Sequence, residues 1–176
     1  VYLALDLSPI GVPEKMIQEQ KFDGVTGWTL NSLQGDSEIT GNQLDNMRNN
    51  QFPSALLRYK EAGTTLELLP GEQVSGKAAI VLRITPKVGS AVKMFLDAET
   101  YLVVRTVVRV NVPQLGEIDQ VSELSDYRTV DGVKVPFQVV NSNPAQSGTI
   151  RISKIEHNVP IDDAMFAVKA PAAVQR

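Results

Sequence analysis

The sequence contains no cysteine, which excludes disulfide bonds, thiol catalysis and cysteine-ligated zinc sites. It contains a single histidine, His157, which stands between Glu156 and Asn158. A general base needs a nucleophile and an orienting acid within reach, and this spacing offers neither, so we interpret His157 as a surface residue. Aromatic residues make up only 6% of the chain, so aliphatic side chains must supply most of the core.

Basic stripes and long apolar runs are also missing. The 17 Lys and Arg residues are scattered and the net charge is −3, which argues against nucleic acid as a partner. No apolar run is long enough to span a bilayer. A length of 176 residues with 43% hydrophobic content predicts one globular domain over residues 1–176. The chain opens without Met on a strand-like run at Val1, so we expect the start to be a cut, with a signal peptide or another N-terminal element upstream.

Alternating apolar and polar residues predict strands along most of the chain, and hairpin-length connections predict antiparallel neighbours. In residues 77–85, for example, every second residue is aliphatic. Residues 117–127 repeat every three positions, as a helix would, but their strand-like length favours a strand. Pro70-Gly71 predicts a turn, and Pro136 predicts an edge strand or a bulge. A slip in the alternation near Ser153-Lys154 predicts a β-bulge.

One helical insertion interrupts the strands. Thr40 is followed three residues later by Gln43, which is the pattern of a capping box, and Leu44 and Met47 then recur at helical spacing. This predicts a helix over residues 41–50, polar enough to bury only a narrow stripe, as a cover would. Pro53 is placed to begin a second short helix that ends near residue 63.

The acidic residues were weighed as catalytic or metal-binding groups. Asp162-Asp163 supplies two adjacent carboxylates, where calcium requires six or more oxygens, so we interpret them as caps of a short helical turn that brings Phe166 against the sheet. Glycosidases need two carboxyl groups at a defined separation, and nothing in the sequence sets one. We therefore expect solvated strand ends and outer faces for five further acidic residues: Asp97, Glu99, Glu117, Asp119 and Glu123.

Two apolar features leave core and ligand surface open as alternatives. Trp28, the only tryptophan, lies on a predicted strand just before the helical insertion. An aliphatic stripe follows the strands further along, at Leu82, Ile84, Met94 and Leu96. Such a stripe fills a closed barrel or lines an open hollow, and periodicity does not distinguish the two.

Several short motifs together resemble the outer-membrane lipoprotein-sorting proteins, the LolA-like and LolB-like carriers with their RseB-like relatives. The motifs are residues 22–28 (FDGVTGW), 95–102 (FLDAETYL), the segment from Asp126-Tyr127 to Phe137, and the segment from Asn158 to Phe166. The resemblance implies a mainly β (α+β) fold, in which a curved antiparallel sheet forms an incomplete barrel and a short helical insertion covers the hollow. It also implies a periplasmic protein that binds acyl chains and has no catalytic activity. The resemblance further implies that a long N-terminal helix and the first strands, which are normal in the family, are lacking here. A lid-latching arginine and an exposed apolar insertion loop, both known in the family, have no match here.

The primary hypothesis is therefore a non-enzymatic periplasmic carrier or sensor that binds lipid or lipoprotein acyl chains and needs no cofactor. If the protein is anchored to the membrane, we expect the anchor to lie in the missing N-terminus. The alternative is a structural or interaction module of a larger envelope protein; a free sheet edge would also suit a strand-exchanged homodimer. An enzyme, such as a hydrolase with carboxylate groups, is the third hypothesis, but no nucleophile, base and orienter can be assembled. The predicted ligand-binding set, cavity and lid together, is Trp28, Leu30, Leu44, Met47, Leu56, Leu82, Ile84, Met94 and Leu96.

Overall fold

The computed structural model describes residues 2–6, 15–32, 35–51, 56–57, 59–60, 63–112, 116–162, 164 and 166. The chain separates into two compact units. Val1–Phe52 together with Pro160–Arg176 form the first unit, and Pro53–Val159 form the second. The prediction of one domain over residues 1–176 stays a prediction.

The first unit contains a four-stranded antiparallel sheet in the order β1 (Tyr2–Asp6), β2 (Lys15–Phe22), β3 (Gly27–Asn31) and β4 (Ser37–Ile39). The β2–β3 turn is fixed by the Asp23 carboxylate, which accepts hydrogen bonds from the Val25 and Thr26 amides at 2.8 and 2.7 Å. Such a side-chain bond two to three residues ahead is the reason why Asp favours turns. Strand β4 was not predicted, because three residues show too little alternation to stand out.

The helix α1 (Gly41–Asn49) packs on this small sheet and confirms the predicted helix. Gly27 makes the close approach possible, because a β-carbon there would lie 3.2 Å from Ile39 Cβ and 3.4 Å from Leu44 Cδ1 and Met47 Sδ. The predicted capping box is wrong: no side chain caps the N-terminus, where Gly41 has φ +58°.

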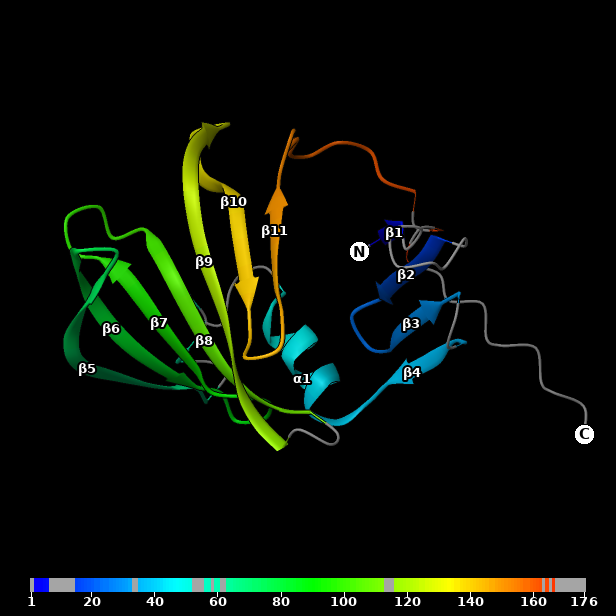
Figure 1. Cartoon of the computed structure of the whole chain (residues 1–176), viewed down its shortest axis with the longest axis horizontal. Helices are drawn as coiled ribbons and strands as arrows, with labels where there is room; N and C mark the ends of the chain where they lie inside the picture. The colour runs from blue at the N-terminus through cyan, green and yellow to red at the C-terminus, as the bar shows by residue number, and fades with distance from the viewer. Residues whose placement is uncertain are drawn as a thin grey trace, which may run out of the picture. The chain divides into compact units, whose positions relative to one another are not determined.

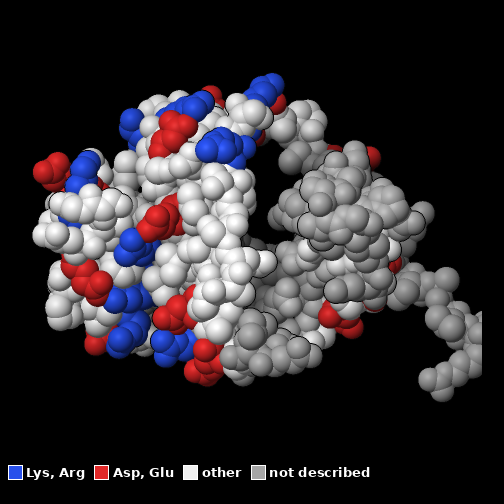
Figure 2. Space-filling model, viewed as in Figure 1, with Lys and Arg blue, Asp and Glu red and all other residues white. Residues whose placement is uncertain are grey.

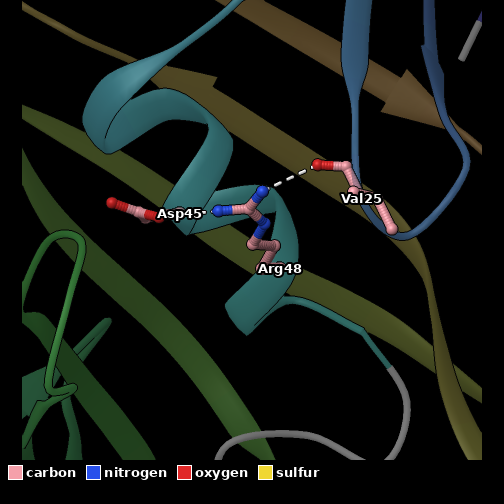
Figure 3. Close-up of polar contacts among 3 residues, drawn as sticks. All are labelled: Val25, Asp45 and Arg48. Carbon is pink, nitrogen blue, oxygen red and sulfur yellow. Dashed lines mark hydrogen bonds and ion pairs between the residues drawn. The ribbon is translucent and has the colours of Figure 1, made fainter.

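Arg48, on the last turn of α1, ties the helix to the β2–β3 turn (Figure 3). Its Nη2 donates to the Val25 carbonyl oxygen at 2.7 Å, and its Nη1 lies 3.3 Å from Asp45 Oδ1. The helix therefore has a polar attachment to the turn besides its apolar contacts around Gly27.

The second unit contains a seven-stranded antiparallel sheet in which each strand pairs with its neighbours in sequence (Figure 1). Its strands are β5 (Thr65–Val74), β6 (Lys77–Thr85), β7 (Val92–Asp97), β8 (Val103–Val112), β9 (Gly116–Val130), β10 (Val133–Ser142) and β11 (Ser147–Arg151). β5 and β11 form its two edges, so the sheet is not closed. The predicted fold class, mainly β with an incomplete antiparallel barrel and a short helix, is confirmed, as is a strand for residues 117–127. That α1 covers a hollow of this sheet stays a prediction.

Two prolines behave differently from expectation. The predicted turn at Pro70-Gly71 is wrong, because β5 continues through it with a bulge between Leu69 and Glu72, and the chain reverses at Ser75-Gly76 instead. An edge strand tolerates the missing N–H of Pro70. Pro136 lies in β10, which is not an edge strand, but β11 pairs only with Gln138–Ser142 and leaves Pro136 beyond the last pair.

Three further predictions concern the segments after α1 and after β11. The predicted bulge near Ser153-Lys154 is wrong, because β11 ends at Arg151 and only the Ile152 amide continues, with a 2.8 Å bond to the Phe137 carbonyl. Phe166 remains 44% exposed, so the idea that it packs tightly against the sheet is also wrong. The second helix, from Pro53, falls largely on residues 52–55, 58 and 61–62, which lie outside the described residues.

Candidate functional site

Strand alternation divides the seven-stranded sheet into two chemically distinct faces. Directly paired residues in antiparallel strands share a face, so the register assigns each side chain to one side. On β5–β8 every charged residue falls on one side, which we name the charged face: Glu67, Glu72, Lys77, Arg83, Lys93, Asp97, Arg105 and Arg109. The opposite side, the aliphatic face, carries Leu66, Leu68, Ile80, Leu82, Ile84, Val92, Met94, Leu96, Val108 and Val110.

The charged face is organised by ion pairs between strands. Figure 2 shows basic and acidic residues interleaved over the seven-stranded sheet. Four pairs connect neighbouring or next-neighbouring strands, with nitrogen–oxygen distances from 2.5 to 2.9 Å: Arg83–Glu67, Lys93–Glu72, Arg105–Glu123 and Arg109–Asp119. The hydrogen bond from Arg109 lowers the pKa of the Asp119 carboxyl group and raises that of Arg109, so this pair is charged at neutral pH. Each charge of these four pairs has a partner, which favours a structural role for this network.

The best-packed core of the second unit lies beneath these charges. Phe95 is 2% exposed and Val81 0% exposed, and they pack with Val74 and Ala79. The Phe95 ring is overlaid by cations, with Lys93 Nζ at 4.9 Å and Arg105 Cζ at 5.7 Å from its centroid. Long basic side chains bury their stems over apolar surface and keep their charge in water. The charged face is thus the face that holds the sheet together.

The aliphatic face brings four of the predicted site residues together. Leu82 pairs directly with Met94, while Ile84 and Leu96 lie one alternation step away on the same strands. Ile84 is 5% exposed, and the other three are only partly buried. At the edge of the sheet, Leu68 is 72% exposed. This face therefore combines continuous aliphatic character with incomplete packing.

The remaining predicted site residues are distributed elsewhere. Leu44 and Met47 of α1 contact the Gly27 face of the small sheet, so Trp28 and Leu30 project from its opposite face by alternation. Leu56 is partly buried in a turn of the second unit. Trp28 and the helix residues thus do not share one face of the small sheet. The ligand-binding role of the whole set stays a prediction.

The polar residues considered as catalytic have structural partners. His157 Nδ1 lies 3.0 Å from Asp131 Oδ2 in the β9–β10 turn. Asp97 is only 8% exposed, so the expectation that it is solvated is wrong. Its carboxylate accepts hydrogen bonds from the Thr100 amide and hydroxyl, which lower the pKa of the group. Asp162 accepts a bond from the Ala164 amide at 2.9 Å, as a cap would, whereas Asp163 lies outside the described residues.

The described residues include no cluster of three or more His, Cys, Asp or Glu side chains that could hold a metal ion. Among the helices that the structure describes, none is long and apolar enough to cross a membrane.

Sequence reasoning missed a hollow on the charged face, near the β5–β6 turn. Its volume is about 370 Å³, within the usual range of small-molecule sites. Val74, Ala79 and Val104 form part of an apolar wall, and Glu123 and Gln138 contribute polar groups. The register of β8 against β7 shifts at this point: Phe95 pairs with Arg105 and Leu96 with Val103, which leaves Val104 between the two pairs and places it at this wall. No sequence pattern signals that shift.

Comparison with known proteins places the fold. The sequence matches no protein-family model and no curated protein sequence. A domain assigned to outer membrane lipoprotein sorting, from Vibrio parahaemolyticus, superimposes with a TM-score of 0.50 at 12% identity, over 87% of this chain and 82% of that one. A DUF1329 family protein from Desulfovibrio piger superimposes with a TM-score of 0.56 at 16% identity, over 87% of this chain and 68% of that one.

The chain shares its fold with these two proteins, one of which carries a name from outer membrane lipoprotein sorting. The resemblance predicted from the sequence motifs is therefore confirmed at the level of the fold. A LolA superfamily protein from Nitrosomonas europaea also matches, with 10% identity and a TM-score of 0.47, over 89% of this chain and 86% of that one. At such low identity a shared lipoprotein-sorting fold specifies the arrangement of strands and leaves the ligand to be argued from the faces of this sheet.

Proposed function

We propose that the protein is a non-enzymatic carrier or sensor that binds the acyl chains of a lipid or lipoprotein on its aliphatic face. The observation that carries the proposal is the segregation of charge on β5–β8. All eight charged residues lie on one face, and the other presents aliphatic side chains that, apart from the buried Ile84, are only partly buried or exposed. An acyl chain gains about 0.8 kcal/mol for each methylene that it buries on such a surface.

The structural neighbours support the same class of function. One carries a name from outer membrane lipoprotein sorting and shares the fold. A carrier of this kind works in the cell envelope, and we propose the periplasm as its location. The ion pairs and turn bonds that engage the acidic residues of the charged face support a binding protein over an enzyme.

The test compares two adjacent residues that lie on opposite faces. Leu82→Gln places a glutamine amide on the aliphatic face, and Arg83→Gln introduces the same glutamine side chain on the charged face. We expect Leu82→Gln to weaken binding of a fluorescent fatty acid roughly tenfold, because a polar group would be desolvated against the chain. Arg83→Gln should leave the affinity unchanged. Circular dichroism verifies that both variants are folded.

Two results would contradict the proposal. One is a wild-type protein that neither co-purifies with lipid in native mass spectrometry nor binds the fatty acid. The other is an equal loss of affinity in both variants, which would place the binding surface elsewhere.

A second candidate function is an interaction module of a larger envelope protein. Every residue of β11, one of the two edge strands of the seven-stranded sheet, is exposed, and Ile150 is 53% exposed. Exposed edge strands take up an additional strand from a partner. A folded protein that binds no fatty acid but self-associates in sedimentation velocity would favour this candidate over the carrier.

A further inference from the structure

The aliphatic side of the seven-stranded sheet carries one pair of opposite charges. Across β5–β11, the register places the charged residues that the structure describes on the charged face, apart from Asp126 and Arg128 on β9. Arg128 pairs with Val135 on β10, and Leu124 of the same strand pairs with Val139. The pair therefore lies on the same side as the aliphatic face, with apolar neighbours on both strands.

The pair is held in a defined geometry. Arg128 Nε and Nη2 donate to the two carboxylate oxygens of Asp126 at 3.1 and 2.6 Å. The guanidinium carbon lies 4.4 Å from the centroid of Phe137, whose side chain is 6% exposed. Asp126 has φ +52°, a left-handed conformation that is uncommon for a non-glycine residue. Planar stacking on an aromatic ring with bidentate bonding fixes an arginine more firmly than a surface ion pair alone.

Both side chains keep unused bonding capacity. An arginine has five N–H donors, and the two bonds to Asp126 leave the Nη1 group and one Nη2 hydrogen without a partner in the described part of the chain. Each Asp126 oxygen accepts one bond and has room for another. The two side chains are 54% and 47% exposed, so a ligand can reach them. A ligand can therefore bind both charges without separating them.

We infer that Asp126 and Arg128 bind the headgroup of a zwitterionic lipid whose acyl chains lie on the aliphatic face. Arg128 donates to the phosphate, and Asp126 accepts from the ammonium. A purely anionic headgroup would face the Asp126 carboxylate as well as the guanidinium, so the pair favours a phosphate next to an ammonium. This inference rests on the proposed function, because acyl binding brings the headgroup to the pair.

The experiment measures displacement of the fluorescent fatty acid by lipids with identical acyl chains. The ligands are phosphatidylethanolamine, phosphatidylglycerol and diacylglycerol, with soluble glycerophosphoethanolamine to distinguish a lipid headgroup from a free phosphate–ammonium compound. We expect phosphatidylethanolamine to bind about five- to tenfold more tightly than diacylglycerol, the effect of charge-assisted bonds at a half-exposed site. Arg128→Gln should abolish this preference and leave diacylglycerol binding unchanged. Asp126→Asn should remove the preference for phosphatidylethanolamine over phosphatidylglycerol.

Arg109→Gln is the matched control. Arg109 is also bonded through two nitrogens to a carboxylate, that of Asp119, but it lies on the charged face. It should leave all affinities unchanged. Equal affinities of the wild type for the three lipids, or equal effects of Arg128→Gln and Arg109→Gln, would overturn the inference and leave the proposed function standing.

Failure of the proposed function has a different signature. If no acyl ligand binds, but glycerophosphoethanolamine binds and Arg128→Gln abolishes that binding, acyl carriage is wrong and the pair recognises a soluble compound. If neither class of ligand binds, both proposals are overturned.

Discussion

Replacement of Phe95 by alanine tests which face of the seven-stranded sheet holds its core. Phe95 is 2% exposed and packs with Val74, Ala79 and Val81 beneath two basic side chains. Phe→Ala in a packed core costs about 3–5 kcal/mol, because the lost transfer free energy adds to the cost of the cavity. We expect a loss of about 4 kcal/mol in the free energy of unfolding, because the core residues around Phe95 stand on paired strands that cannot readily collapse into the cavity.

The assay is urea unfolding followed by circular dichroism. With a slope of about 2 kcal/mol per molar urea, a loss of about 4 kcal/mol lowers the midpoint by about 2 M. Phe95→Leu keeps most of the apolar volume and should cost less than about 1.5 kcal/mol, so it reports on the site even if the alanine variant does not fold. Leu68→Ala, on the aliphatic face and 72% exposed, should change the stability by less than about 0.5 kcal/mol.

The reasoning would be refuted if Leu68→Ala destabilised the protein as much as Phe95→Ala. It would also be refuted if Phe95→Ala cost less than about 1 kcal/mol, because a ring with 2% exposure would then contribute no more than a surface side chain.

Two further predictions concern the packing of the first unit and the stability of the protein at low pH. Gly27→Val should lower the thermal midpoint by overpacking against Ile39 and Leu44, at a cost of about 1–3 kcal/mol, whereas Gly148→Val, with no atom within 4 Å of its β-carbon position, should not. The Thr100 amide and hydroxyl lower the pKa of Asp97 below 3.8, so its ionised form stabilises the folded state at neutral pH. This contribution is complete above the unfolded pKa of 3.8 and is lost as the pH falls through the lower folded pKa, so the urea midpoint should drop between about pH 5 and pH 2, and drop less in Asp97→Asn.

Elements with a regular apolar periodicity were the part of the fold that could be predicted from the sequence. The strand at Lys77–Thr85 was predicted with its observed bounds, because Ile80, Leu82 and Ile84 recur at every second position. The change of period after Thr40 located α1 to within one residue. Local turn chemistry was less reliable: Pro70-Gly71 is a common turn pair, but a bulge on an edge strand accommodates it without a reversal.

The candidate site was predictable only in part. Alternation grouped Leu82 with Met94, but it could not show that Phe95, which shares its face with the polar residues Lys93 and Asp97 two positions away, is the better-packed residue. Its burial arises because Lys93 and Arg105 fold over the ring, which depends on side-chain conformation. The Asp126–Arg128 pair was also missed, since it depends on a left-handed backbone at Asp126. Irregular backbone and cross-strand side-chain packing leave no periodic trace in a sequence.

The two edges of the seven-stranded sheet differ in how they tolerate contact with another strand. β5 combines Pro70 with a bulge after Leu69, two features that obstruct pairing with a further strand. β11 has neither feature, and all of its residues are exposed. A sheet with two open edges can add copies without limit and grow into a fibre, whereas a single open edge is used up when two copies meet. Edge-to-edge association of this sheet would therefore stop at a pair, and the obstructed edge limits its tendency to polymerise.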